Sequence, residues 1–256
     1  MTRVLTINQL PAAGGTVISR FLAANNWFIN SEVSPSSART SGTFSPGIFA
    51  DLLLDQGVSD TRSKNLFREK IFCESVDTSI EIAMYYSRNL GVRIWHHPSF
   101  TADRALGFDR ASQLIHARYH PLVGHLVVIR NPIDNFLSFR KQKDWSNYAR
   151  RSDGFQIFIN RYLNFIHHFE NLGAYFFTFE RFCSDSSSLL KFLDKNFEVD
   201  SPEVIQNDLT GITMTGASGR QNDQITPRGR LETSCDEINQ WLKSEAYLSF
   251  VKKFPF

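Results

Sequence analysis

The sequence predicts an α/β fold: a single domain with a mainly parallel central sheet flanked by helices. Short apolar segments typical of buried strands alternate with longer amphipathic segments, and this alternation indicates a parallel sheet. The candidate strands are VLTINQ, NWFIN, GVRIW, HLVVIR and AYFFTFE. The chain has 256 residues, of which 42% are hydrophobic, so it is long enough to bury one sizeable core. We therefore expect residues 1–256 to form one domain.

Apolar residues at helical spacing and suitable capping residues predict the helices between these strands. The helices are expected at residues 16–24, 65–89, 132–145, 154–171, 186–196 and 236–253. The segment SEVSPSSARTSGTFSP, after the second strand, is rich in Ser, Thr and Pro and can bury little. We expect a mobile loop at about residues 31–65, and loops of that length are uncommon unless functional.

The segment LPAAGGTVISRFL, after the first strand, predicts a strand, a glycine turn and a helix. Gly14 and Gly15 let the backbone approach an anion, and the N–H groups at the start of the helix attract phosphate. Thr16 lies in the first helical turn, so its hydroxyl is expected near the same anion. The segment lacks the lysine of the G-x-x-x-x-G-K-[ST] motif. A turn with a purely structural role fits these residues equally well.

The segment HLVVIRNPIDNFLSFR predicts a buried strand followed by a helix, with Asn131 as N-cap and Pro132 at the first helical position. The strand ends in Arg130, where a magnesium-dependent nucleotide hydrolase would carry an aspartate. Arg130 can bind a second phosphate through its planar guanidinium, and Ser138 can donate its hydroxyl to the same group. The alternative is an ion pair between Arg130 and a carboxylate such as Asp134, with Ser138 facing solvent.

The segments PAAGGTV and RNPIDNFLS resemble the two nucleotide-binding signatures of the sulfotransferases that use 3′-phosphoadenosine-5′-phosphosulfate (PAPS). FFTFERFCSDSSSLLKFL is similar to a strand, acidic turn and helix of that family. GASGRQNDQITPRGR resembles its carboxy-terminal loop, which closes over the nucleotide and is expected at about residues 215–232. The resemblance implies a P-loop-like nucleotide-binding fold.

The resemblance also implies an activity and a binding site. The activity is transfer of a sulfuryl group from PAPS, as co-substrate, to a hydroxyl or amine acceptor, with 3′-phosphoadenosine-5′-phosphate (PAP) as product and no metal. The implied nucleotide-binding residues are Ala12, Ala13, Gly14, Gly15, Thr16, Val17, Arg130, Ser138, Ser218, Gly219, Arg220, Arg228 and Arg230.

Three residues are candidates for the base that removes the acceptor's proton. His96 and His97 end the strand in GVRIWHHPSF, where the family carries a histidine base, and His96 is the closer match. A histidine with an ordinary pKa near 6.5 is largely neutral at cellular pH. Glu32 follows the second strand, where related bacterial proteins carry a glutamate facing the acceptor. Structural roles for one histidine and for Glu32 remain open.

The chain departs from the family where a lysine or arginine normally follows the loop proline, because Ala12 and Ala13 stand there. Either Arg20, Arg220 or Arg228 supplies the missing positive charge, or the protein is slow or inactive. The second hypothesis is therefore a sulfotransferase-like protein that binds a nucleotide or a partner without catalysis. A nucleoside or sugar kinase is disfavoured, because the loop lysine and the strand-end aspartate are both absent.

Charge and cysteine usage restrict the remaining possibilities. The net charge of +2 comes from 28 basic and 26 acidic residues spread along the chain, so we expect no nucleic-acid partner. No apolar run approaches the roughly 20 residues that span a bilayer, and we expect no transmembrane segment and a cytoplasmic protein. Cys73, Cys183 and Cys235 are far apart, so we expect free thiols, no disulfide and no structural metal.

Overall fold

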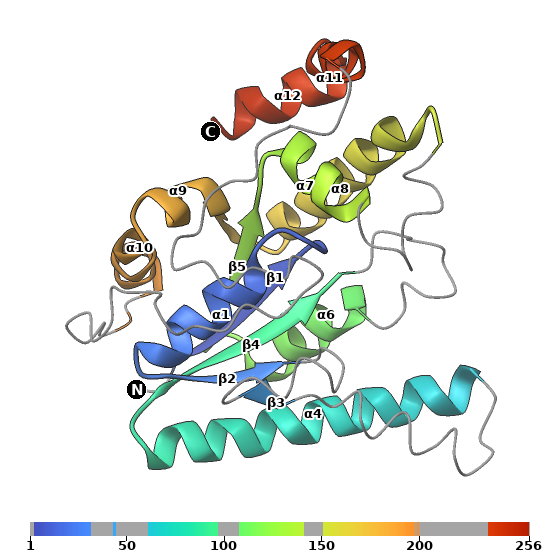
Figure 1. Cartoon of the computed structure of the whole chain (residues 1–256). Coiled ribbons are helices and arrows are strands. Elements are labelled where there is room, and N and C mark those ends of the chain that lie inside the picture. Colours follow the sequence, from blue (N-terminus) through green and yellow to red (C-terminus); the bar gives the residue numbers. More distant parts are fainter. Residues whose placement is uncertain are drawn as a thin grey trace.

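The computed structural model describes residues 3–31, 43–44, 61–96, 108–140, 151–197, 199 and 235–255. Within them, strands form one sheet in the order β3-β2-β4-β1-β5-β6, flanked by helices (Figure 1). The strands are β1 (Val4–Gln9), β2 (Trp27–Ser31), β3 (Thr43–Phe44), β4 (Asn89–Trp95), β5 (Val123–Ile129) and β6 (Tyr175–Thr178). Every pair of neighbouring strands is parallel, which confirms the predicted α/β class.

The helices cover both faces of this sheet. They are α1 (Gly15–Ala24), α4 (Thr61–Tyr85), α6 (Phe108–Tyr119), α7 (Pro132–Arg140), α8 (Gly154–Asn171), α9 (Phe179–Ser184), α10 (Ser187–Phe197), α11 (Cys235–Leu242) and α12 (Glu245–Lys253). One hydrophobic cluster joins β1, β2, β5 and β6 to α1, α9 and α10. On the opposite face, a second cluster joins the strands to α4 and α6, and a third joins β5 to α7, α8, α11 and α12.

The order of the strands places the central strand β1 between β4 and β5. Because all three are parallel, their carboxyl ends lie at one edge of the sheet. The chain leaves β1 towards β2 on one side and later crosses to β5 on the other. Ligands of open α/β sheets bind at such a switch point, outside the carboxyl ends of the strands.

The prediction of a loop at about residues 31–65 is wrong at three places. Ser31 belongs to β2, Thr43–Phe44 forms β3, and α4 begins at Thr61. The short strand β3 pairs with β2 at the edge of the sheet, where one free row of backbone groups was still available. The rest of the expected loop lies outside the described residues.

Two further boundaries differ from the prediction because side chains and backbone geometry stop a helix. The helix expected to continue to residue 89 ends at Tyr85, since Ser87 has a positive φ of 51° and the Arg88 N–H donates to the Ala83 carbonyl. The single helix expected at residues 236–253 is two helices, α11 and α12. The Ser244 hydroxyl starts the second one by accepting a hydrogen bond from the N–H of Tyr247.

A similar cap shortens the last predicted strand. The apolar run AYFFTFE was expected to be extended throughout, but β6 ends at Thr178 and α9 starts at Phe179. The Thr178 hydroxyl accepts a hydrogen bond from the Arg181 N–H, which satisfies one of the first helical donors. Phe179 and the neighbouring Glu180 therefore lie in the first turn of a helix rather than in the sheet.

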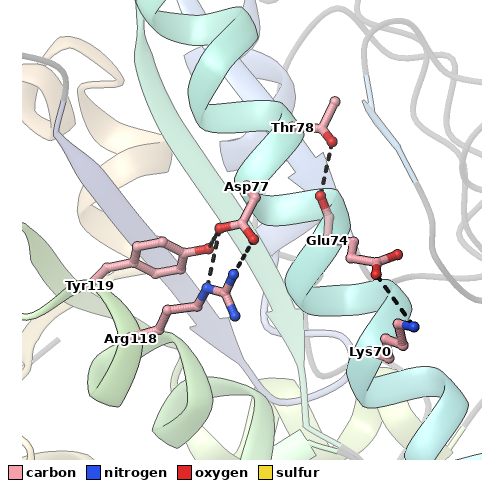
Figure 2. A network of polar contacts seen from close by, with 6 residues as sticks. All are labelled: Lys70, Glu74, Asp77, Thr78, Arg118 and Tyr119. Atoms are coloured by element: carbon pink, nitrogen blue, oxygen red, sulfur yellow. Dashed lines mark hydrogen bonds and ion pairs between the residues drawn. The ribbon is translucent and has the colours of Figure 1, made fainter.

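A polar contact joins the long helix α4 to α6 (Figure 2). The Asp77 carboxylate accepts hydrogen bonds from the Arg118 guanidinium and the Tyr119 hydroxyl. Glu74, about one turn earlier on α4, forms a more open ion pair with Lys70, with 3.9 Å between Nζ and Oε1. The contact at Asp77 holds the two helices together beside β4.

Two expectations about the chain as a whole concern its cysteines and membranes. Cys73 and Cys183 are free thiols in the structure, as predicted. None of the helices in the described ranges combines the length and the apolar character that a membrane crossing requires.

Candidate functional site

The candidate site lies at the carboxyl edge of β4, β1 and β5. The glycine loop follows β1, His96 follows β4, and Arg130 follows β5. These segments are far apart in the sequence, and the parallel sheet brings them to one edge (Figure 1).

The loop between β1 and α1 needs its glycines for conformation and for space. Gly14 has φ 91° and ψ 2°, in the left-handed region that favours glycine. A Cβ atom at Gly14 would lie 2.2 Å from the Phe179 ring, and one at Gly15 would lie 1.0 Å from Oε1 of Gln9. Both positions therefore exclude a side chain unless their neighbours move.

The start of α1 offers hydrogen-bond donors to an anion. The N–H group of Gly15 donates to no backbone carbonyl within the described part of the chain. The ten-residue helix also directs the positive end of its dipole towards the loop. Val17, in the same turn, is buried in the core and anchors the helix against β1.

Arg130 reaches from the end of β5 to this loop. Its Nη1 donates a hydrogen bond of 2.9 Å to the carbonyl of Ala12, and its guanidinium lies over the Phe179 ring at 5.3 Å. The residue is only 8% exposed. Its side chain thus contacts the loop and Phe179, and not Asp134, which was the alternative partner considered from the sequence. The two segments predicted to bind phosphate lie against each other.

The backbone of Arg130 is held in place by Tyr162 of α8. The buried Tyr162 hydroxyl accepts the Arg130 N–H at 2.8 Å and donates to the Arg130 carbonyl at 3.2 Å. Burial raises the pKa of the phenol, so the hydroxyl stays protonated and able to donate. The sequence pattern did not single out Tyr162, because its spacing on an aromatic helix is that of any core residue.

Asn131 caps α7 as predicted and links it to two other helices. Its Oδ1 accepts the Ile133 N–H at 3.0 Å, its N–H donates to Oε1 of Glu180 at 2.8 Å, and its Nδ2 donates to the Tyr247 hydroxyl at 3.3 Å. Burial raises the pKa of Glu180, and among the described residues its Oε2 has no hydrogen-bond partner. Ser138 lies half-buried further along α7.

His96 is the predicted base that the structure describes, and its ring is fully buried. The backbone N–H of His96 donates to the Gln9 carbonyl at 2.9 Å, and the ring nitrogen Nε2 lies 3.2 Å from Oδ1 of Asn8. The ring packs against Phe165 and Phe169, with centroids 5.1 and 5.2 Å away. An acceptor can reach this ring only if the residues that cover it move.

The structure places Arg20 beside a second buried arginine, Arg93, which the sequence reasoning missed. They are 6% and 5% exposed. Burial, and then the nearby positive charge of Arg20, lower the pKa of Arg93 to about 10. Arg93 pairs in register with Ile7, so it lies on the face of the sheet that α1 covers. A charged residue inside the apolar segment GVRIW was the signal that could have identified it.

The remaining predicted site residues lie outside the described residues, so their roles stay predictions. They are Glu32, His97, Ser218, Gly219, Arg220, Arg228 and Arg230. The side chain of Thr16 is likewise not described, although its backbone is the second residue of α1.

The fold and the site together define an α/β protein with a basic, glycine-containing candidate anion site at the switch point of a parallel sheet. Within the described ranges, no group of three or more His, Cys, Asp and Glu side chains is arranged to hold a metal ion. Comparison with protein families and with curated proteins finds no match to this chain.

Proposed function

We propose that the protein is a PAPS-dependent sulfotransferase that acts on a hydroxyl or amine acceptor. The observation that carries this proposal is the contact between Arg130 and the carbonyl of Ala12. It joins the two segments that resemble the family's nucleotide-binding signatures. Two anion-binding elements then lie side by side, which suits a nucleotide with a phosphate at each of two positions.

The charges near the site support a dianionic or more highly charged ligand. Arg130 lies at the loop, and the buried side chains of Arg20 from α1 and Arg93 from β4 lie between α1 and the sheet. Charges interact more strongly at buried positions than in bulk water. Arg20 and Arg93 are therefore candidates for the positive charge that Ala12 lacks, in addition to Arg220 and Arg228.

The proposed reaction moves one proton and one sulfuryl group. The acceptor's proton passes to a base, and the freed electron pair of the acceptor oxygen or nitrogen forms a bond to sulfur. The bond between sulfur and the 5′-phosphate oxygen breaks, and its electron pair leaves with PAP. His96 is the first candidate for the base, with His97 and Glu32 as alternatives.

A second function, nucleotide binding with little or no transfer, is favoured by two observations. Ala12 occupies the position where the family carries a basic residue. The His96 ring has no exposed surface. Single-turnover transfer from radiolabelled PAPS distinguishes this function from the first.

Calorimetry tests the nucleotide assignment directly. We expect PAP to bind without magnesium, and AMP, which lacks the 3′-phosphate, to bind much more weakly. ATP with magnesium serves as the comparison for a kinase-like protein. Equal affinities for PAP and AMP would contradict the proposal.

Arg130 provides the first mutational prediction. Arg130→Gln should weaken PAP binding roughly tenfold to a hundredfold, because a hydrogen bond to a charged group contributes about 1.5–3 kcal/mol. Ser138→Ala should weaken it to a similar degree. Arg140→Gln is the matched control, since Arg140 lies at the end of α7, the helix that follows Arg130, in a half-exposed ion pair with Glu237. A control that weakens binding as much as Arg130→Gln would indicate a general charge effect instead of a specific site.

A further inference from the structure

A line of polar side chains, all buried except the half-buried His116, crosses the face of the sheet that α6 and α8 cover. The line runs from the end of β4 to helix α6 and consists of His96, Asn8, Thr6, His125 and His116. Thr6 of β1 lies opposite His125 of β5 in the parallel register, and Asn8 is two residues further along β1. All three therefore lie on the same face of the sheet.

The orientation of the Asn8 carboxamide follows from its backbone neighbours. Its Nδ2 lies 3.3 Å from the carbonyl oxygen of Leu126 and 3.5 Å from that of Thr6. Carbonyl oxygens accept hydrogen bonds and cannot donate them, so the NH2 group must face them. The amide oxygen Oδ1 then faces Nε2 of His96 at 3.2 Å.

An amide oxygen in this position determines which nitrogen of His96 carries a hydrogen. Because Oδ1 accepts only, Nε2 must donate, and in the neutral ring Nδ1 is then the nitrogen with the lone pair. We propose that Asn8 is a positioning residue that holds His96 as the Nε2–H tautomer and makes Nδ1 its basic nitrogen.

The hydrogen-bonded line continues from Asn8 to the two remaining histidines. Thr6 Oγ1 accepts from Asn8 Nδ2 at 2.7 Å, and its hydrogen can donate to Nδ1 of His125 at 2.8 Å. His125 then carries its hydrogen on Nε2 and donates to Nδ1 of His116 at 2.9 Å. Burial, with smaller effects from His116, His168 and His120, lowers the pKa of His125 to about 4, which keeps that ring neutral. With Thr6 as the donor, this chain of hydrogen bonds gives His125 its hydrogen on Nε2 and leaves Nδ1 of His116 as the acceptor.

The consequence for catalysis rests on the proposed function, whereas the tautomer assignment does not. If His96 is the base, the acceptor's proton arrives at Nδ1. The Nε2–H of the resulting imidazolium stays hydrogen-bonded to Oδ1 of Asn8, whose partial negative charge stabilises the new positive charge. The buried position of His96 makes this stabilisation larger than it would be in water.

Nuclear magnetic resonance of the full chain, with 15N-labelled histidine rings, tests the assignment. Two-bond 15N–1H spectra at about pH 8, where an ordinary histidine is neutral, distinguish the two tautomers. His96, identified by loss of its signals in His96→Gln, should show the Nε2–H pattern. Asn8→Leu, which keeps the approximate shape but removes both polar atoms, should lose this pattern and shift the ring towards Nδ1–H.

Thr6→Val is the matched second variant. It removes the hydroxyl but leaves Asn8 held by the Leu126 carbonyl, so His96 should keep its tautomer while His125 loses its fixed one. An Nδ1–H pattern for His96 in the wild type, or an unchanged pattern in a folded Asn8→Leu, overturns the proposal. If Asn8→Leu does not fold, the wild-type and Thr6→Val spectra show whether His96 carries its hydrogen on Nε2. Calorimetry with PAP on the same samples shows separately whether the nucleotide assignment fails.

Discussion

Tyr162 shows how much of the site depends on one residue outside it. Its hydroxyl bonds both the N–H and the carbonyl of Arg130, at the point where β5 ends and the chain turns into α7. The side chain has no exposed surface, so water cannot replace either bond. Tyr162 therefore orients the backbone from which the Arg130 guanidinium reaches the loop.

We predict that Tyr162→Phe lowers the free energy of unfolding by about 1–3 kcal/mol, because it leaves buried backbone groups without a partner. Urea denaturation measures this loss. Tyr175→Phe is the matched control, since Tyr175 is 42% exposed, and it should change stability very little. Equal losses for the two variants would show that the hydroxyl bonds to Arg130 contribute nothing.

The loop between β1 and α1 depends on packing as well as on backbone conformation. Gly14 and Gly173 both have positive φ values, of 91° and 68°. A Cβ atom at Gly14 meets the Phe179 ring, whereas one at Gly173 has nothing within 4 Å. Substitutions at the two glycines therefore separate the loss of stability caused by the left-handed backbone from the loss caused by the steric contact.

Gly173→Ala should lower the free energy of unfolding by about 1 kcal/mol through backbone strain alone. Gly14→Ala should lower it by at least about 2 kcal/mol, and it should also weaken PAP binding, since the loop must shift away from Phe179. Thermal unfolding and calorimetry measure the two effects. If both variants lose the same stability, the Phe179 ring yields without cost and the loop is less tightly packed than we infer.

The contact between α4 and α6 depends on Asp77 (Figure 2). Asp77→Asn should lower the free energy of unfolding by about 1 kcal/mol, mainly through the hydrogen bond from the partly buried Tyr119 hydroxyl. The exposed ion pair with Arg118 should add little. Glu74→Gln, one turn away in the open pair with Lys70, should have no measurable effect in the same denaturation experiment. A larger loss for Glu74→Gln would show that the helices are joined elsewhere.

The stability of the whole molecule should depend on pH through His125. Its pKa is about 4 in the folded protein, below the ordinary value near 6.5 expected in the unfolded chain. Between these values the unfolded chain binds more protons, so stability is fully present above about pH 6.5 and is lost as the pH falls towards 4. The raised pKa of Glu180 gives a slope of the opposite sign around its own titration.

Comparison with a variant separates the contribution of His125 to this pH dependence from that of Glu180. Between about pH 8 and about pH 5, the wild type should lose about 2 kcal/mol more than His125→Gln, which does not titrate at this position. The exposed His167, changed to Gln, is the control and should leave the pH dependence unchanged. Urea denaturation across this range provides the measurement. Parallel pH profiles for the wild type and His125→Gln would show that His125 does not carry the linkage.

The sequence by itself determined the fold class and much of the candidate anion site. Alternating strand and helix patterns are local, so they predicted the parallel sheet, the Asn131 cap and the two glycines of the loop. Several of the elements that it missed or misplaced were short or stopped by a single cap, such as β3, α9 and the break at Ser244. A hydroxyl cap outweighs hydrophobic periodicity over so few residues.

Only the tertiary structure decided which of these residues meet. Thr6 and His125 bond across a separation of 119 residues, and Arg130 reaches Ala12 across 118. Both contacts depend on the placement of β1 beside β5, which local periodicity does not encode. The burial of His96 and the proximity of Arg20 to Arg93 follow from the same strand order. The sequence shows which side chains can donate, accept or carry charge. The packing of the parallel strands determines which of these side chains are in contact.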